Sequence, residues 1–321
     1  MSSKFDAHST ADQVLEGIDL TNRTVFVTGA TSGIGLETAR SLVARGATVI
    51  GTGRDIVKNR DVLDDAAKRG GGRFDIIRMD LADLASVRSV AADMRERALE
   101  FDAVVANAGV MNTPFGHTAD AFETQFGTNF IGHFVLLNEL APIIRDNGRV
   151  VILSSSAHRF ADVDLDDPNF EDTPYDPTIA YGRSKTADAL LAVGFDERHK
   201  DRGIRAAAVH PGVIPTDLSR YTDPEQLEAA IAAMQEEHVA LGNEPFVPKN
   251  TEQGAATSVW VAFVADGNEI GGKYCEDCGV SPVLDGENVG AFAPGVFPYA
   301  LDSQRADALW SRASQMVDAA N

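Results

Sequence analysis

The sequence has few cysteines and few positive charges for its size. Two cysteines in 321 residues cannot form the disulfide framework of a small secreted domain. Lys and Arg number 28 against 48 Asp and Glu, which gives a formal net charge of −20. Nucleic acids and anionic membranes bind through clustered positive charge, so this imbalance disfavours both as partners.

Long apolar runs are also missing. The stretches Ala206–Val209 and Ala255–Val264 fall short of the ~20 apolar residues that span a bilayer. The N-terminus shows no basic segment followed by an apolar core, as a secretory signal would. We therefore expect a soluble, cytoplasmic protein. The hydrophobic content of 44% is sufficient for one large α/β domain.

Apolar strands alternate with amphipathic helical segments through the first two thirds of the chain. The predicted strands are 24–28, 48–50, 74–79, 103–106, 149–153 and 205–209, and the predicted helices include 85–98, 121–140 and 181–197. Strands that are apolar throughout indicate a parallel sheet buried on both faces. We expect an N-terminal arm at 1–20 and a single domain over 21–321.

Two stretches depart from this alternation. Residues 156–180 are rich in Asp and Pro, which indicates a loop. The region 213–250 is irregular apart from one amphipathic helix. The apolar side of that helix carries Leu227, Ile231, Met234, His238 and Leu241. Core packing and a lid over a substrate site both fit this stripe.

Three glycines lie between the first predicted strand and the helix after it. Gly29, Gly33 and Gly35 would permit a tight turn and let a pyrophosphate approach backbone N–H groups at the helix N-terminus. Their spacing, Gly-x-x-x-Gly-x-Gly, differs from the Gly-x-Gly-x-x-Gly of other dinucleotide-binding folds. By themselves they also fit an ordinary strand-to-helix turn.

Tyr181 and Lys185 are four residues apart in a predicted helix, so their side chains share one face. An ammonium beside a phenol favours the phenolate and lowers the Tyr pKa from about 10 towards the working pH. A general acid needs such a pKa. The spacing alone also fits a half-buried Tyr beside a solvated Lys.

The order of the motifs is more specific than any one of them. In chain order they are Thr28–Gly35, Asp80-Leu81, Asn107-Ala108-Gly109, Asn129, Ser154–Ser156, Tyr181-x-x-x-Lys185 and His210–Thr216. This series closely resembles the short-chain dehydrogenase/reductase family over about residues 22–220. Residues 149–158, the HPGV segment, residues 271–274 and the N-terminal arm are most similar to the branch of retinol dehydrogenases and WW-domain oxidoreductases.

The resemblance implies a fold and an activity. The fold would be α/β, a single doubly wound Rossmann-type parallel sheet with helices on both faces. The activity would be hydride transfer between a nicotinamide cofactor and an alcohol or its carbonyl, which a protein supports by positioning the reactants and supplying a proton.

The resemblance also implies roles for individual residues. Tyr181 would be the general acid/base, Ser155 would orient the substrate oxygen, Lys185 would also bind the cofactor ribose, and Asn129 would hold a water in a proton relay. Three consecutive serines leave Ser154 as the alternative to Ser155. The other implied cofactor-binding residues are Gly29, Thr31, Ser32, Gly33, Ile34, Gly35, Asp80, Leu81, Asn107, Ala108, Gly109, Pro211, Gly212, Val213 and Thr216.

The cofactor preference depends on the end of the second predicted strand. An acidic residue there would bind the adenosine ribose and repel a 2′-phosphate, but the sequence has Arg54. Arg54 matches the position where NADP-preferring members of the resembled family carry a basic residue. We therefore expect NADP, with NAD as the second choice. A surface Arg balanced by Asp55 is the other interpretation.

The remaining polar motifs are less specific. Cys275 and Cys278 have the spacing of a metal or redox site, but zinc would need two further ligands, so no metal site is predicted. His133, His158 and His210 are interpreted as structural hydrogen-bonding residues.

The expected partners are a small-molecule substrate and a second copy of the chain. The substrate would be a lipophilic carbonyl or alcohol, and the assembly a homodimer or homotetramer. Two alternatives stay open: a dinucleotide-binding sensor or scaffold without turnover, and an enzyme that transfers hydride only transiently, as sugar epimerases do.

Overall fold

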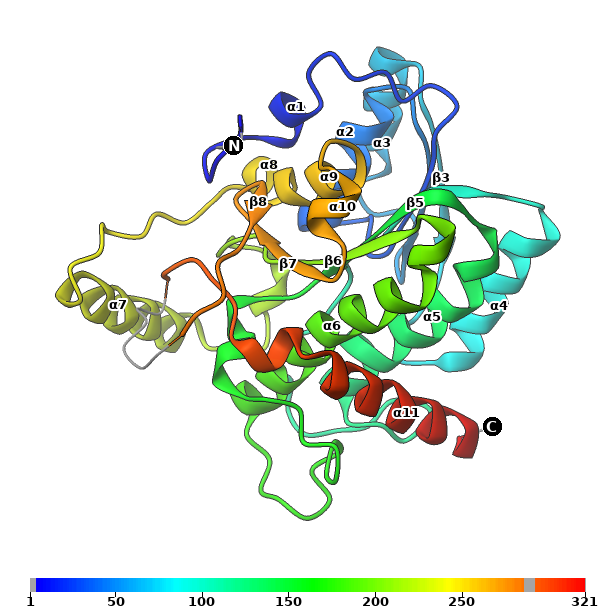
Figure 1. Cartoon of the computed structure of the whole chain (residues 1–321). Coiled ribbons are helices and arrows are strands. Elements are labelled where there is room, and N and C mark those ends of the chain that lie inside the picture. Colours follow the sequence, from blue (N-terminus) through cyan, green and yellow to red (C-terminus); the bar gives the residue numbers. More distant parts are fainter. Residues whose placement is uncertain (1–3, 286–291, 321) are drawn as a thin grey trace.

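The structure is a computed structural model that describes residues 4–285 and 292–320 (Figure 1). Its centre is one sheet with the strand order β3-β2-β1-β4-β5-β6-β7-β8. The strands are β1 Thr24–Val27, β2 Thr48–Gly53, β3 Arg73–Arg78, β4 Phe101–Ala106, β5 Ile144–Leu153, β6 Arg205–Val209, β7 Lys273–Glu276 and β8 Gly279–Val280. All neighbours are parallel except β7 and β8. The predicted parallel sheet is confirmed.

The order in which strands are added to the sheet reverses at the neighbouring strands β1 and β4. β2 and β3 are added on one side of β1, and β4 to β7 are added in order on its other side. At such a reversal the loops after neighbouring strands diverge and leave a crevice at the carboxyl ends of the strands. The candidate site lies at these ends.

Helices cover both faces of the sheet. They are α1 Ala11–Val14, α2 Gly33–Val43, α3 Arg60–Gly70, α4 Leu84–Glu96, α5 Gly132–Leu140, α6 Pro177–His199, α7 Pro224–Ala240, α8 Thr251–Gly254, α9 Ala256–Phe263, α10 Gly267–Ile270 and α11 Ser303–Ala319. One core includes Phe101, Phe130 and Phe195 and lies under α4, α5, α6 and α11. The other includes Leu42 and Val259 and lies under α1, α2 and α9. The N-terminal segment belongs to this second core through α1.

The helix α6 begins four residues before Tyr181. Its first residue, Pro177, needs no backbone N–H partner, and the Asp176 carboxylate accepts hydrogen bonds from the N–H groups of Thr178 and Ile179 at 2.8 and 3.0 Å. Tyr181 therefore lies within a formed helix and not at its frayed first residue.

The helix predicted at 121–140 begins later than expected. Ala121 has a left-handed φ of 65°, and a π-helix, Phe126–Ile131, precedes α5. The carboxylate of the fully buried Glu123 accepts hydrogen bonds from the backbone N–H groups of Gln125 and Phe126, which fixes where the π-helix starts. Asn129 lies inside this π-helix, a distortion that is common at functional sites.

The amphipathic helix predicted after Thr216 is present as α7, but its environment differs from the expectation. Figure 1 shows α7 projecting away from the sheet. Leu227, Ile231 and Met234 are only half-buried, and Leu241 is 44% exposed. The interpretation of this stripe as ordinary core is therefore wrong. Separately, the described helices include none with the length and apolar character needed to cross a membrane.

Candidate functional site

The glycine-rich loop between β1 and α2 is in close contact with the segment after β4. A Cβ on Gly35 would lie 2.3 Å from Asn107 Nδ2, and one on Gly29 would lie 3.0 Å from Ala108 Cβ. Gly33 has a left-handed φ of 53° and faces Thr216. These glycines are required by close approach and backbone conformation, which exceeds what a simple strand-to-helix turn demands.

The hydroxyl of Thr28 links these segments. It accepts hydrogen bonds from the backbone N–H groups of Asn107 and Ala108, each at 2.9 Å, and it contacts His133 Nε2 at 2.9 Å. His133 Nδ1 lies 2.8 Å from the Asn129 carbonyl oxygen, which can only accept, so Nδ1 carries the proton. The Thr28 hydroxyl then donates to Nε2. His133 thus has the structural role expected from the sequence.

Asn129 is fully buried, and its amide fixes the loop after β4. Oδ1 accepts from the Val110 N–H at 2.8 Å, and Nδ2 donates to the Val110 carbonyl at 2.9 Å and to the Ser184 hydroxyl at 3.0 Å. Both amide hydrogens are therefore used within the protein. This geometry assigns the side chain a positioning role between the loop and α6.

The three consecutive serines have different surroundings. The Ser154 hydroxyl donates to the Lys185 carbonyl at 2.7 Å, so it fastens β5 to α6. The Ser155 hydroxyl accepts from the Ala157 N–H at 3.1 Å, and this hydroxyl lies close enough to Tyr181 to lower the pKa of its phenol. Ser155 is therefore the serine that acts on the Tyr181 phenol, and its role toward a substrate oxygen stays a prediction.

The Lys185 ammonium is buried beside a carboxylate that the sequence reasoning did not single out. Nζ donates to the Leu153 carbonyl at 2.9 Å and forms an ion pair with Asp188 Oδ2 at 2.7 Å. Lys185 Nζ also lies 5.7 Å from the centre of the Tyr181 ring. The i,i+3 spacing of Lys185 and Asp188 on one helix was a visible signal for this pair.

Burial raises the pKa of Tyr181 above its ordinary value, while Lys185 and the Ser155 hydroxyl lower it and Asp188 raises it. The net direction is upward. The sequence-based expectation of a net lowering considered the ammonium alone and is wrong for the protein by itself. Burial favours the neutral phenol more than the ammonium favours the phenolate.

Residues after β2 lie beside the glycine-rich loop. Asn59 Nδ2 donates to the Thr31 carbonyl at 2.9 Å. Arg54 is exposed, and in the described structure Asp55 accepts from the N–H groups of Val57 and Lys58 instead of pairing with Arg54. No direct ion pair therefore joins Arg54 to Asp55 among the described residues, and the interpretation of Arg54 as an exposed surface residue stays open.

Lys58 is a second basic residue of this loop, and the sequence reasoning missed it. Its Nζ forms an ion pair with Asp217 at 2.9 Å. This contact joins the loop after β2 to the segment after Thr216. The neighbouring Thr216 hydroxyl accepts from the Leu218 N–H.

The other predicted cofactor-binding positions also lie at strand ends. Asp80 follows β3, and its carboxylate accepts from the Ala82 N–H at 3.0 Å, which is a turn contact. Leu81 is buried. Pro211, Gly212 and Val213 follow β6, and the Val213 carbonyl accepts from the Lys249 N–H at 3.0 Å.

His158 is fully buried and His210 is partly buried. Burial lowers the pKa of His158 to about 4 and that of His210 to about 3. His158 Nδ1 bonds the Ser155 carbonyl, and its Nε2 accepts from the Phe297 N–H at 3.2 Å. The C-terminal segment therefore braces the turn that carries Ser155.

Both cysteines are buried, and no disulfide joins them. Burial raises the pKa of the Cys278 thiol to about 12, and that of Cys275 still further, so neither is a reactive thiolate. Within residues 4–285 and 292–320, no cluster of three His, Cys, Asp or Glu side chains could hold a metal ion.

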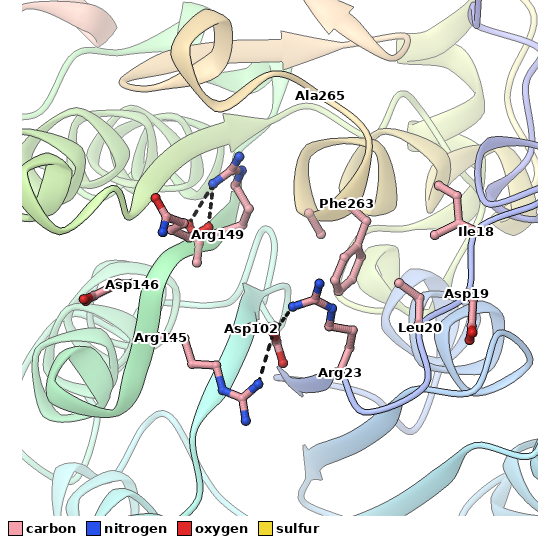
Figure 2. Close-up of a pocket in the computed structure, with 13 residues that line it drawn as sticks. Ile18, Asp19, Leu20, Arg23, Asp102, Arg145, Asp146, Arg149, Phe263 and Ala265 are labelled. Atoms are coloured by element: carbon pink, nitrogen blue, oxygen red, sulfur yellow. Dashed lines mark hydrogen bonds and ion pairs between the residues drawn. The ribbon is translucent and has the colours of Figure 1, made fainter.

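A pocket of about 480 Å³ lies at the opposite edge of the sheet, near the starts of β1, β4 and β5 (Figure 2). Its arginines are largely balanced by acids. Asp102 pairs with Arg23 at 2.7 Å and Arg145 at 3.5 Å and accepts from the Thr24 N–H. These contacts hold the strand starts together and lie apart from the predicted site residues.

Comparison with known proteins agrees with this geometry. The family model described as short chain dehydrogenase matches residues 23–227. The chain belongs to the short-chain dehydrogenase family. A Streptomyces lividans protein named "Probable oxidoreductase" is 40% identical over 94% of this chain and 100% of its own length.

Two solved structures extend the likeness. A crystal structure from Mycobacterium paratuberculosis is 31% identical, with a TM-score of 0.67 over 94% of this chain and 95% of that one. A blue fluorescent protein from a metagenomic library, in complex with NADPH, is 25% identical, with a TM-score of 0.62 over 81% of this chain and 98% of that one. This short-chain dehydrogenase is accordingly an NAD(P)-dependent oxidoreductase on a Rossmann-type sheet. The closer resemblance to the retinol dehydrogenase branch stays a prediction.

Proposed function

We propose that this short-chain dehydrogenase interconverts a lipophilic alcohol and its carbonyl, prefers NADP(H), and uses Tyr181 as its general acid/base. One observation carries the proposal. Ser155, in the turn after β5, and Lys185, on α6, both act on the Tyr181 phenol, and Lys185 Nζ lies 5.7 Å from the centre of the Tyr181 ring. A bound nicotinamide would supply or accept the hydride.

The residues have the following proposed roles in carbonyl reduction. The Tyr181 phenol gives its proton to the substrate oxygen as charge develops there, and the Ser155 hydroxyl holds that oxygen by a hydrogen bond. Lys185 stabilises the phenolate that remains. Two of its three ammonium hydrogens are used by Leu153 and Asp188, so one is left for a ribose hydroxyl.

The site has the features that a dinucleotide needs. The N-terminus of α2 follows the glycine-rich loop, and the Ser32 hydroxyl makes no capping bond there. A Cβ on Gly109 would lie 3.1 Å from Asn129 Oδ1 and 3.8 Å from Lys185 Nζ, so glycine keeps this approach open. We propose that the implied cofactor-binding residues named above line this path.

The preference for NADP is supported by charge after β2. Arg54 is exposed, and Lys58 lies on the same loop with only an exposed carboxylate as its partner. A 2′-phosphate would gain charge-assisted hydrogen bonds from such groups. The structurally similar blue fluorescent protein is bound to NADPH. NAD is the second candidate.

A lipophilic substrate is supported by aromatic side chains near the site. Phe160 is 45% exposed and lies next to Gly182, the residue after Tyr181. Tyr221 is also exposed and precedes Thr222, whose hydroxyl bonds Asn112. The loop at 156–180 and the region 213–250 would form the walls of the substrate site.

A panel of aldehydes and ketones tests the proposal when each is incubated with NADPH and NADH side by side. We expect alcohol to form in equal amounts with the NADPH consumed, and more slowly with NADH. Cofactor binding without consumption for every substrate would favour the sensor or scaffold. Conversion of a substrate without net cofactor consumption would favour epimerase-like chemistry.

We further propose a homodimer or homotetramer that acts in the cytoplasm without a nucleic-acid or membrane partner. The net charge of −20 supports the absence of nucleic-acid and membrane partners, and the lack of a disulfide between the two cysteines supports the cytoplasmic location. Sedimentation equilibrium would measure the assembly directly, and a single species at monomer mass would contradict it.

A further inference from the structure

Asp188 is a carboxylate inside the protein, one helical turn after Lys185 on α6. The exposed fraction of the side chain is 1% for Asp188 and 6% for Lys185, and their charged atoms lie 2.7 Å apart. Asp188 Oδ1 is buried without a hydrogen-bond partner in the described structure. The hydrogen bonding of this carboxylate is therefore concentrated on Lys185.

A buried ammonium is unstable without a compensating charge. Burial by itself favours the neutral amine, and Asp188 raises the pKa of Lys185 in opposition to this effect. The Leu153 carbonyl and Asp188 Oδ2 also fix two of the three N–H directions of Nζ. Asp188 thus favours the charged form of Lys185 and, together with the Leu153 carbonyl, fixes its orientation. Burial raises the pKa of Asp188 itself to about 7, so the carboxylate carries its charge in the alkaline range.

We propose that Asp188 is a positioning residue that keeps Lys185 protonated and correctly oriented. Its negative charge would also partly offset the stabilisation of the Tyr181 phenolate by the Lys185 ammonium. The proposal rests on the proposed function, because it assigns Tyr181 and Lys185 their roles in hydride transfer. Asp188 would act through Lys185 and would not touch the substrate.

Lys185 and Asp188 are the charged groups that act on Tyr181 among the described residues. His133 approaches Lys185 from α5, but burial lowers its pKa to about 4, so it is neutral. Tyr274 approaches from β7, and burial raises its pKa well above the ordinary value. Farther out, the charged groups that act on Tyr274 are Arg159 and Glu276.

Tyr181 and Lys185 titrate as a coupled pair, and carbonyl reduction needs both of their protons. Removing a nearby negative charge makes the first proton leave the pair at a lower pH, whichever group releases it. Without Asp188, the alkaline limit of reduction should therefore move to lower pH. A residue that only stabilised the fold would lower activity without moving this limit.

The test is the pH profile of kcat/KM for carbonyl reduction in Asp188→Asn, which keeps the shape and removes the charge. We expect the alkaline limit to fall by about one pH unit or more. The matched control is Asp196→Asn on the same helix, because Asp196 is buried and pairs with Arg205 at 2.9 Å. This control should lose stability and keep the wild-type limit. An unmoved limit in Asp188→Asn, or an equal shift in the control, would overturn the proposal.

A second measurement separates this proposal from the proposed function. The ultraviolet absorbance of the phenolate reports Tyr181 without turnover when the signal of Tyr181→Phe is subtracted. A midpoint that moves in either direction in Asp188→Asn supports the coupling even if no carbonyl is reduced. If the midpoint is unchanged although the variant reduces carbonyls, the proposed role of Asp188 is rejected and the proposed function stands. If the Asn variant does not fold, Asp188→Ser takes its place with the same expectations.

Discussion

The reaction end of the site, which comprises Ser155, Tyr181 and Lys185, and the helix α7 differ sharply in the contacts that fix their positions. Ser155 lies in the turn after β5, and Tyr181 and Lys185 lie on α6. Hydrogen bonds and an ion pair fix the polar atoms of this region. The helix α7 has a half-buried apolar stripe and projects from the body of the protein (Figure 1). The fold therefore determines the chemistry of the site much more tightly than the surface that would select the substrate.

The difference has a physical origin. A buried polar group must be paired, so each substitution at the reaction end leaves an unsatisfied partner. The stripe of α7 makes contacts such as that between His238 and the Phe292 ring, with centres 5.8 Å apart. Few partners constrain where this helix rests. The following variants test whether the two regions separate in function as they do in structure.

Tyr181→Phe should produce the largest effect. It removes the acid and preserves the ring, so turnover should fall by about 10² or more while cofactor affinity stays within about twofold. Steady-state rates and a cofactor titration provide the two measurements. Tyr299→Phe is a matched control that removes a hydroxyl bonded to the His158 carbonyl. A loss smaller than about tenfold in Tyr181→Phe would be too small for a general acid.

Ser155→Ala and Ser154→Ala should separate catalysis from stability. Ser155→Ala should reduce kcat by about tenfold or more, because its hydroxyl acts on the Tyr181 phenol. Ser154→Ala should chiefly lower the free energy of unfolding, by about 1 kcal/mol, since it loses a bond to the Lys185 carbonyl. The reverse ranking of kcat would move the catalytic serine to position 154.

Arg54→Ala should weaken NADP binding by about tenfold or more and leave NAD binding nearly unchanged. The reason is the loss of a charge-assisted hydrogen bond to the 2′-phosphate. Arg60→Ala is the control, because Arg60 lies over the Phe74 ring at 5.2 Å. Titration of both variants with both cofactors provides the measurement. Equal weakening of NADP and NAD in Arg54→Ala would show that Arg54 is structural.

Ile231→Ala and Met234→Ala should have the smallest effects, and these should concern the substrate. If α7 closes over a bound substrate, the ranking of substrates by kcat/KM should change by up to about tenfold while cofactor affinity stays constant. Glu228→Ala on the exposed side of α7 is the control. An unchanged ranking would mean that α7 does not form part of the substrate site.

Local motifs made much of the reaction end predictable. The glycine-rich loop and the spacing of Tyr181 and Lys185 constrain backbone and side-chain placement over a few residues, and the alternating strands predict the sheet. The structure also distinguishes Ser155 from Ser154 by their different hydrogen bonds. Sequence could not supply that distinction from the residues alone, because adjacent serines are chemically identical.

Features that depend on tertiary contacts were missed. The π-helix at Phe126–Ile131 follows from a buried Glu123 that accepts two backbone bonds. The upward pKa of Tyr181 follows from burial, which the i,i+4 spacing does not report. The half-buried state of α7 likewise depends on what lies next to it. These are long-range properties, so periodicity along the chain carries little information about them.

Transfer of deuterium to a carbonyl substrate from NADPH that carries deuterium at both C4 positions tests the central claim most directly. With the wild-type protein, we expect the label on the carbinol carbon of the alcohol. With Tyr181→Phe, label transfer should be nearly absent although NADPH binds with nearly the same affinity. Binding of NADPH by the wild type without label transfer to any carbonyl would contradict the claim and identify a dinucleotide-binding protein without turnover.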